Sequence, residues 1–406
     1  MKVEERFLRY VAFDTQSKDE SDTFPSTEKQ KRLAEALTAE LQELGASDVC
    51  MDENGYVYGT IPASKGAEGQ SVLALIAHMD TATEQPGANV RPRIVKQYDG
   101  GDLVLNEALG IVTRKADFPA LSNYIGQDLI VTDGTTLLGA DDKAGIAEIM
   151  TAAEAMLSGT VRHPEVRIVF TPDEEVGRGV DRIDMQKVNA AYGYTVDGEE
   201  LGELEAETFN AASARVRFHG VCVHTGAAFG IMKNASLLAM EFHAMLPPLE
   251  VPAATRDRMG FFHLSGMKGC MEEAELSYLL RDHDGKKLEQ KKEILRKAAE
   301  LMNLKYGEQT AELVITDSYR NMYEKIMPEH KELIEYAREA MRELGIKPIE
   351  DPIRGGTDGA RLSFMGLPCP NLGTGGHACH GCHEFIPIPS MEKVVELLKR
   401  LVGKFA

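Results

Sequence analysis

The feature that most constrains the fold is a strand-forming segment that runs directly into two adjacent carboxylates. Residues 165–170 alternate polar and apolar side chains and are rich in β-branched ones, which predicts a half-buried strand. Pro172 lacks the N–H that a strand interior needs and therefore ends it. Glu174 and Glu175 then lie at the strand end, where α/β folds place ligands. Neighbouring carboxylates repel unless a cation neutralises them, so the pair indicates a metal site, with a solvated acidic turn as the alternative.

The same arrangement, a strand followed by a His or an acidic residue, recurs along the chain. Residues 72–77 form an uninterrupted apolar run, which predicts a strand buried on both faces. His78 and Asp80 follow it and face the same way, and a carboxylate beside a metal-binding His commonly orients the imidazole. Asp197 follows the predicted strand 191–196. The alternatives are a His–Asp pair inside the core and a tight Asp-Gly turn.

Asp141 lies at the turn before a helix predicted over residues 146–157. A carboxylate at this position is either a ligand or a plain helix cap, because the helix dipole favours negative charge there. Strands that end in such residues, with helices between them, predict an α/β fold. We expect a mainly parallel mixed sheet with helices on both faces and a site along one edge.

Two local patterns add detail to the first part of the chain. Asn54-Gly55 predicts a hairpin over residues 49–63, because Asn-Gly suits the tight turn between antiparallel strands. Residues 27–30 fit a capping box that opens a helix ending at Gly45.

Composition restricts the partners of the protein. A chain of 406 residues exceeds one ordinary core, so two domains are expected. The net charge of -19 excludes a phosphate-backbone partner, which requires clustered Lys and Arg, so we expect no nucleic acid. The N-terminus has no apolar run, and no stretch reaches the roughly 18 apolar residues of a membrane helix. We therefore expect a cytoplasmic protein with no membrane partner, whose six cysteines are reduced.

Residues 210–325 have a different order of predicted strands and helices from the rest of the chain. Their strands and helices follow the order β-α-β-β-α-β, which predicts an inserted ferredoxin-like α+β domain. The catalytic metal-binding domain would then comprise residues 1–209 and 326–406. The insert has a sheet edge that can pair with a second copy, so we expect it to serve as the dimerisation (lid) domain of a homodimer.

The densest group of metal-ligand residue types lies near the C-terminus, where residues 377–384 contain three His and two Cys. Part of it matches the Cys-x-x-Cys-His pattern of haem attachment, but that chemistry belongs outside the cytosol. A structural zinc site would need a second Cys or His pair at motif spacing, and the chain has none.

Together these motifs resemble the M20 family of dinuclear zinc peptidases, and most closely its tripeptide aminopeptidase branch, over essentially the whole chain. The motifs are His78-Met79-Asp80, Asp141-Asp142-Lys143, Glu174-Glu175, Asp197-Gly198 and His380-Gly381-Cys382-His383-Glu384. Residues 139–145, 170–175 and 210–213 resemble the branch rather than the wider family. The resemblance implies a zinc-exopeptidase-like fold and two zinc ions per subunit, with cobalt or manganese as alternatives.

The resemblance also implies the ligands of each ion. His78, Asp141 and Asp197 would bind one zinc, and Asp141, Glu175 and His380 would bind the other, with Asp141 as the bridge. Paired ions can acidify a shared water and polarise a carbonyl.

The same resemblance makes Glu174 the general base and Asp80 the residue that orients His78. A base must stay free to take the water's proton and deliver it to the leaving amine. This explains the adjacency of Glu174 and Glu175, since one binds the metal and the other does not.

Substrate contacts carry over less completely. His224 resembles the family's oxyanion-stabilising His, but the branch pattern His-Pro-Gly-Thr-Ala-Lys-Gly is His-Thr-Gly-Ala-Ala-Phe-Gly here. Arg281 and Arg354 resemble the positions that hold the peptide's C-terminal carboxylate, with plain salt bridging as the alternative. Cys379 and Cys382 replace the branch's Phe and Lys, and a thiol beside His380 can compete for zinc or be oxidised.

These observations predict a metal-dependent aminopeptidase that removes the N-terminal residue from short peptides, preferably tripeptides. The alternative within the family is an N-acyl amino acid deacylase or a dipeptidase, which would share every metal ligand. A non-catalytic metal-binding protein is the alternative of a different class, and the retention of Glu174 argues against it.

Overall fold

The computed structural model describes the whole chain, Met1–Ala406, and divides into two compact units. The first unit comprises Met1–Ala206, Glu324–Glu350 and Thr357–Ala406, and the second comprises Glu207–Tyr323 and Asp351–Gly356. The second unit thus takes in a short segment that lies beyond residue 325, the end of the insert expected from the sequence. None of the helices combines the length and apolar character that crossing a bilayer requires.

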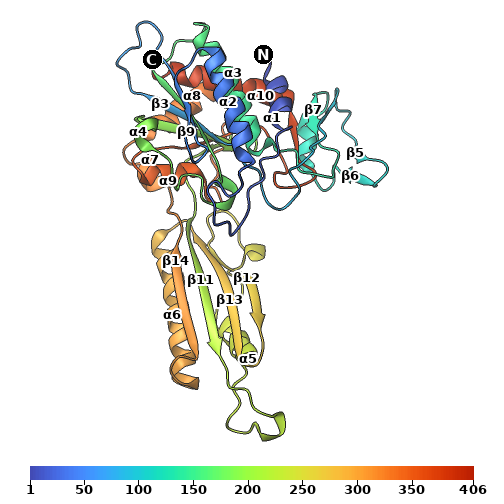
Figure 1. Ribbon diagram of the computed structural model, residues 1–406, viewed down its shortest axis with the longest axis vertical. Helices are drawn as coiled ribbons and strands as arrows, with labels where there is room; N and C mark the ends of the chain where they lie inside the picture. Colours follow the sequence, from blue (N-terminus) through green and yellow to red (C-terminus); the bar gives the residue numbers. More distant parts are fainter. The chain divides into compact units, whose positions relative to one another are not determined.

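The first unit is built on a seven-stranded mixed sheet (Figure 1). Its strands, in spatial order, are β1 (Ser47–Met51), β2 (Val57–Ile61), β8 (Val166–Thr171), β3 (Leu73–His78), β9 (Tyr192–Gly198), β15 (Asn371–Gly373) and β10 (Leu204–Glu205). The pairs β8–β3, β3–β9 and β9–β15 are parallel, whereas the outer pairs are antiparallel. The expected hairpin over residues 49–63 is confirmed as the pair β1–β2.

Helices cover both faces of this sheet. They are α1 (Val3–Tyr10), α2 (Gln30–Leu44), α3 (Ala140–Leu157), α4 (Met185–Val188), α7 (Tyr323–Ile326), α8 (Lys331–Glu343), α9 (Asp358–Phe364) and α10 (Ile388–Gly403). Helix α3 packs on β3 and β9. On the other face Ala74 and Ile76 of β3 share a buried cluster with Leu362 of α9. Because alternate residues of a strand face opposite ways, both faces of β3 are buried, as its apolar run predicts.

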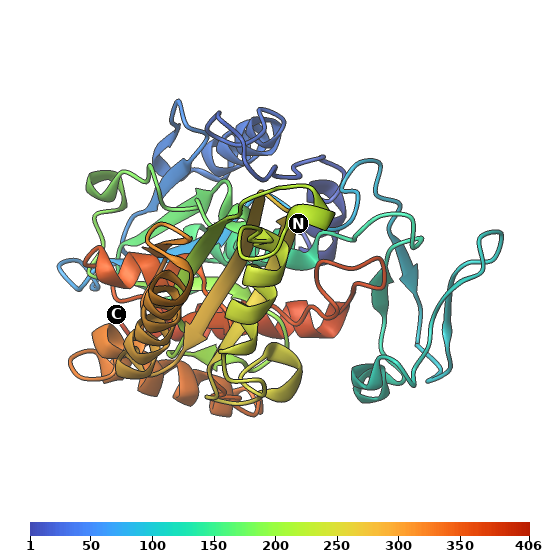
Figure 2. The same cartoon turned by 90° about the horizontal axis from the view of Figure 1, so that it is seen from below.

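Residues between β3 and α3 form a smaller β subregion of the first unit. A three-stranded sheet contains β16 (Phe385–Pro387), β7 (Leu129–Val131) and β4 (Arg93–Val95), and β5 (Leu103–Asn106) pairs with β6 (Ile111–Thr113). The ribbon β5–β6 is drawn in teal in Figure 2. The strand β16 comes from the C-terminal part of the chain, directly after the His- and Cys-rich segment, so this sheet ties that segment to the subregion.

The second unit is a four-stranded antiparallel sheet in the order β12-β13-β11-β14. Its elements in chain order are β11 (Asn210–His219), α5 (Ala235–Ala244), β12 (Phe261–Gly269), β13 (Glu273–Asp282), α6 (Gly285–Tyr306) and β14 (Ala311–Asp317). Alternate strand residues such as Val216, Leu276 and Leu280 join Leu238 and Leu295 of the two helices in one buried cluster. This topology confirms the expected ferredoxin-like insert, and with it the α/β fold class.

One local expectation is wrong. The capping box at residues 27–30 does not form, because α2 begins only at Gln30 and its N-cap makes no side-chain hydrogen bond. Thr27 Oγ1 instead donates to the carbonyl of Gln16 at 2.8 Å, and Gln30 Nε2 donates to Asp173 Oδ1 at 2.7 Å. Gln30 Nε2 also donates to Thr27 Oγ1 at 3.2 Å, so the two side chains bond to each other and to tertiary partners instead of capping the helix N–H groups.

Candidate metal centre

Three of the expected ligands lie at the same edge of the large sheet. His78 is the last residue of β3, Asp197 is the next-to-last residue of β9, and Glu175 follows β8 in the 3-10 turn Glu174–Val176. Strands β8, β3 and β9 are adjacent and parallel, so their carboxyl ends meet. The sheet topology alone therefore brings these side chains together, as open parallel sheets do at their ligand sites.

Asp141 lies between the two candidate imidazoles. It stands at the start of α3 with non-helical backbone angles (φ -83°, ψ 106°). One carboxylate oxygen, Oδ1, is 2.8 Å from His78 Nε2, and the other, Oδ2, is 3.2 Å from His380 Nε2. Each oxygen thus faces a different imidazole, which is the arrangement that a bridging carboxylate requires.

Two further contacts complete two groups around Asp141. His78 Nε2 is 3.1 Å from Asp197 Oδ1, and His380 Nε2 is 3.0 Å from Glu175 Oε2. The first group is His78, Asp141 and Asp197, and the second is Asp141, Glu175 and His380. All five residues named as ligands from the sequence therefore lie side by side, in the two sets expected.

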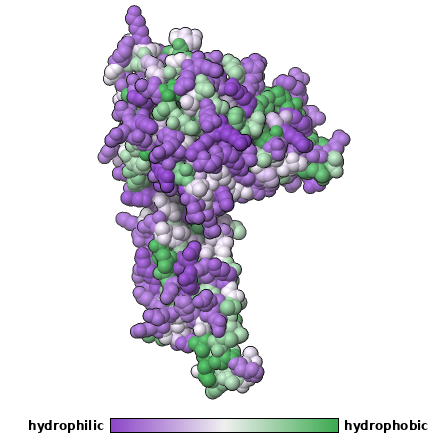
Figure 3. Space-filling view, in the orientation of Figure 1, coloured by the Kyte–Doolittle hydropathy of each residue, from purple (hydrophilic) through white to green (hydrophobic).

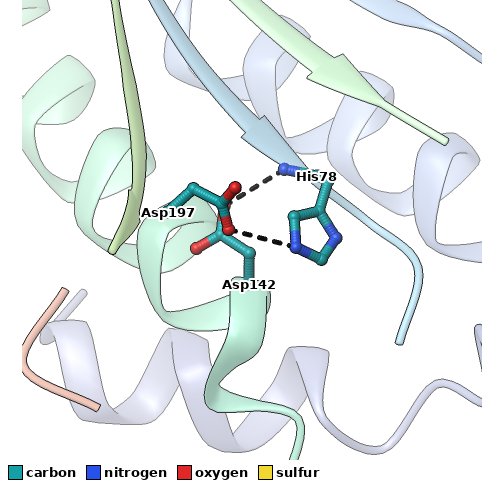
Figure 4. Close-up of side chains that lie close together, drawn as sticks. All are labelled: His78, Asp142 and Asp197. Atoms are coloured by element: carbon teal, nitrogen blue, oxygen red, sulfur yellow. Dashed lines mark hydrogen bonds and ion pairs between the residues drawn. The ribbon is translucent and has the colours of Figure 1, made fainter. Parts of the chain in front are cut away.

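Asp142 is a neighbour that sequence reasoning did not single out. Its side chain is buried and lies beside His78 and Asp197 (Figure 4). The backbone N–H of His78 donates to Asp142 Oδ2 at 3.1 Å, and that of Gly145 donates to Oδ1 at 3.2 Å. Because both oxygens already accept backbone hydrogen bonds, Asp142 fixes the end of β3 against α3. The sequence does contain a signal for Asp142, because Asp141-Asp142 is a pair of adjacent acids like Glu174-Glu175.

The carboxylates at this site carry more negative charge than the protein neutralises. Burial, followed by the nearby Asp141, raises the pKa of Glu175 to about 8, and burial raises the pKa of Asp197 to about 6. Hydrogen bonds with Asp141 and Glu175 raise the pKa of His380 to about 12. Without another cation, Glu175 and His380 would therefore both hold a proton at neutral pH.

The side chains fit a pair of divalent cations. Glu175 Oε1 is buried and has no hydrogen-bond partner, although buried polar atoms almost always have one. The ligand atoms of His78, Asp141 and Glu175 lie within 4.8 Å of one another, as do those of His78, Asp142 and Asp197. Imidazole nitrogens and carboxylate oxygens are donors that Zn²⁺, Co²⁺ and Mn²⁺ accept.

Asp80 holds two parts of the site together by hydrogen bonds. It is fully buried, and its two oxygens accept the backbone N–H groups of Glu174 at 3.0 Å and Glu175 at 3.2 Å. His78 Nδ1 lies 3.3 Å from Asp80 Oδ1. Asp80 therefore ties the imidazole of His78 to the turn that carries both glutamates.

A second buried carboxylate holds the other side of this turn. Asp173 accepts hydrogen bonds from Ser26 N at 2.6 Å, Ser26 Oγ at 2.5 Å and Gln30 Nε2 at 2.7 Å. It adopts a left-handed backbone (φ 59°), which turns the chain sharply out of β8. Sequence reasoning missed this role because the donors lie more than 140 residues away.

The three residues expected to contact substrate all belong to the second unit. His224 is exposed, and its Nδ1 accepts the N–H of Gly226. Arg354 donates to the carbonyls of Asp257 and Met259 and to Thr255 Oγ1. Their roles, like that of Arg281, stay predictions.

The two arginines differ in the donors they have left. Arg281 uses only Nη1, which donates to the carbonyls of Leu280 and Ala212, while its guanidinium lies over the ring of Tyr319. Arg281 therefore retains free N–H groups, whereas both terminal nitrogens of Arg354 are engaged.

Cys379 and Cys382 are both free thiols and half-buried. Burial, followed by the charge of Asp141, raises the pKa of the Cys379 thiol well above its usual range.

Comparison with known proteins agrees with this geometry. Residues 133–404 match the model of peptidase family M20/M25/M40. Peptidase T of Caldanaerobacter subterraneus subsp. tengcongensis is 52% identical over 402 residues, covering 99% of this chain and 98% of the relative. Peptidase T of Alkaliphilus oremlandii is 50% identical over 404 residues, with 99% and 98% covered.

Solved structures show the same fold at low identity. The aminopeptidase PepT from Bacillus cereus has a TM-score of 0.77 at 22% identity, covering all of this chain and 98% of that one. A dinuclear metal-binding peptidase of the M20 family from Bacillus subtilis has a TM-score of 0.66 at 13% identity, with 99% and 98% covered. The resemblance to M20 peptidases is thus confirmed, and with it a metal-binding hydrolase. The chain belongs to peptidase family M20/M25/M40.

Proposed function

We propose that the protein removes the N-terminal residue from short peptides, preferably tripeptides, with two zinc ions and Glu174 as general base. The name peptidase T, carried by relatives about half identical over their whole length, supports this activity. His78, Asp141 and Asp197 would hold one ion, and Asp141, Glu175 and His380 the other. When bound, such a pair supplies polarisation of the scissile carbonyl and a water of lowered pKa.

The observation that carries the proposal is the contrast between the two adjacent glutamates. Glu175 Oε2 faces His380 at 3.0 Å, whereas the carboxylate of Glu174 makes no hydrogen bond or ion pair with the protein. Burial, followed by the charge of Asp197, raises the pKa of Glu174 well above its usual range. A free carboxylate of raised pKa is suited to take a proton from water and return it to the departing amine.

Asp80 gives Glu174 its position. Because Asp80 accepts the N–H groups of both glutamates, the two side chains leave the turn from a fixed backbone. Glu175 is thereby held in the ligand group while Glu174 stays beside it, which separates the roles of two chemically identical residues.

The test replaces Glu174 with Gln or Ala and measures both bound metal and turnover. Loss of the base should leave two metal ions bound and lower the rate of trialanine hydrolysis at least ~100-fold. Glu53→Gln, an exposed acid in the β1–β2 hairpin, is the matched control. Unchanged turnover in the Glu174 variants would refute its role as base.

The substrate class is tested with wild-type protein. Release of alanine should be faster from trialanine than from dialanine or tetraalanine, and N-acetylalanine should yield no acetate. Acetate release without peptide cleavage would replace the aminopeptidase with a deacylase. Metal analysis of protein purified without added metal would establish whether zinc, cobalt or manganese is bound.

We also propose a homodimer formed through the second unit. Strands β12 and β14 are the edges of its sheet, and an edge strand presents unpaired backbone groups. Large apolar side chains are also exposed in this unit, including Phe229 and Ile231 in the loop between β11 and α5 and Leu237 and Met240 on α5. Figure 3 shows a hydrophobic area at the bottom of the view. Sedimentation at several concentrations should give twice the chain mass, and a monomer throughout would refute the dimer.

A further inference from the structure

Glu384 accepts hydrogen bonds from four successive backbone N–H groups. Its Oε2 accepts those of Leu138 at 2.6 Å and Gly139 at 2.8 Å, and its Oε1 accepts those of Ala140 at 2.7 Å and Asp141 at 3.2 Å. The side chain is 1% exposed. The last of the four donors is the backbone of the residue that lies between the two imidazoles.

These N–H groups are available because they belong to the two residues before α3 and to its first two residues. The first N–H groups of a helix have no partner within the helix. Gly139 adopts a left-handed backbone (φ 82°), which lets the successive N–H groups point to one side. A carboxylate from elsewhere in the chain fills the position that a capping side chain usually takes.

The four backbone N–H dipoles stabilise the negative charge of Glu384. No Lys or Arg forms an ion pair with it anywhere in the structure. Burial raises its pKa to about 7, although the N–H groups of Gly139, Asp141 and Leu138 oppose this shift. Burying a carboxylate without a cationic partner costs folding free energy. We therefore expect a function in the way Glu384 joins two parts of the chain.

Glu384 also belongs to the segment that carries His380. This segment is closed by mutual backbone hydrogen bonds between His377 and Phe385, the first residue of β16, at 3.0 and 3.1 Å. Glu384 N additionally donates to the carbonyl of Gly381. The Glu384 carboxylate therefore anchors the loop that carries His380 to the turn that carries Asp141, although His380 and Asp141 are 239 positions apart.

We infer that Glu384 is a positioning residue that holds Asp141 and His380 at ligand separation before any metal binds. The inference rests on the proposed function, because it assigns Glu384 to the ion shared by those two ligands. Sheet topology cannot place either residue, since neither lies on a strand of the large sheet. Glu384 supplies the connection that the strands supply for the other ligands.

The experiment compares Glu384→Gln with wild type by titrating metal-free protein with Co²⁺, following the visible spectrum of the bound ion and chelator competition. Gln keeps the shape but has one acceptor oxygen, so one pair of N–H groups would face an NH₂ group. We expect affinity for at least one Co²⁺ to fall 10–100-fold, with a changed spectrum. Glu384→Asp keeps the carboxylate at shorter reach, and its affinity should lie between the two.

Glu40→Gln is the matched control. Glu40 is a buried acid on α2 that accepts from Arg6 Nε at 2.8 Å and Tyr10 OH at 2.9 Å on α1. It should lose stability while keeping Co²⁺ affinity and spectrum.

Three results would overturn the inference while the proposed function stands. They are wild-type affinity and spectrum in Glu384→Gln, an equal loss of affinity in Glu40→Gln, and failure of both Glu384 variants to fold without metal. A wild-type protein that binds no Co²⁺ would refute the proposed function itself.

Discussion

Replacing Asp80 with Asn removes one acceptor from the centre of the site while keeping the shape of the side chain. Asp80 lies next to three donors, the N–H groups of Glu174 and Glu175 and the imidazole of His78. Oδ1 faces Glu174 N and His78 Nδ1, whereas Oδ2 faces Glu175 N. Asn can supply only one of these oxygens, so its NH₂ group must face at least one N–H.

The expected magnitude follows from this count. One buried N–H left without an acceptor costs about 1–3 kcal/mol. In Asp80→Asn the unfolding free energy of the metal-free protein should fall by that amount. Loss of the carboxylate beside the His78 imidazole should separately lower metal affinity 10–100-fold, because such carboxylates orient the ring and raise its basicity.

Urea unfolding of the metal-free protein and chelator competition with Zn²⁺ measure the two effects independently. Asp128→Asn is the matched control, since Asp128 also accepts a backbone N–H, that of Gln97 at 2.9 Å, but water can replace it there. The control should change neither metal affinity nor stability by more than about 0.5 kcal/mol. Wild-type zinc affinity in Asp80→Asn would refute the argument that Asp80 orients His78.

Three further outcomes are expected. Asp173→Asn should lower kcat with little change in metal content, because it weakens the hydrogen bonds that hold the Glu174 turn to Ser26. Steady-state kinetics and metal analysis measure the two quantities, and an unchanged kcat would contradict the prediction. Glu148→Met should raise the unfolding free energy by about 1–3 kcal/mol, because both Glu148 oxygens are buried without partners. Burial raises the pKa of Glu148, so its carboxyl keeps a proton in the folded protein that the unfolded chain releases near pH 4. The stability gained by Glu148→Met, measured by urea unfolding, should therefore be larger at pH 8 than at pH 5. A variant less stable than wild type would contradict the prediction. The metal-free protein should lose stability as pH rises from 6 to 8, because Glu175, with a pKa of about 8, holds a proton only when folded. The slope is up to about 1.4 kcal/mol per pH unit for each such proton, and a flat or rising profile without metal would contradict it.

Elements that rest on local patterns could be predicted from the sequence. The apolar run before His78, the Asn54-Gly55 turn and the β-α-β-β-α-β order of the insert all correspond to elements of the structure. Each depends on short-range periodicity or turn chemistry, which neighbouring residues determine. The capping box at residues 27–30 also looked local, but Asp173 competes for Gln30 from across the first unit.

The ligands themselves divide in the same way. His78, Glu175 and Asp197 follow parallel strands, so the strand-end rule places them together without any knowledge of the family. Asp141 and His380 lie in a turn and a loop, and only the resemblance to M20 peptidases joined them to the others.

What places those two residues is a set of hydrogen bonds from one side chain to distant backbone groups. Such bonds have no periodicity and no preferred residue spacing, so neither pattern nor propensity predicts them. Glu384 illustrates the point, because in the sequence it is one more acid beside a His-rich cluster, and only its four donors give it a position. Asp80 acts on the Glu174 turn in the same manner, and Asp173 holds that turn with one backbone and two side-chain donors. Loop-borne ligands therefore need buried anchors that strand-borne ligands do not, and in an uncharacterised metalloenzyme a buried carboxylate that binds only backbone N–H groups is a marker of such an anchor.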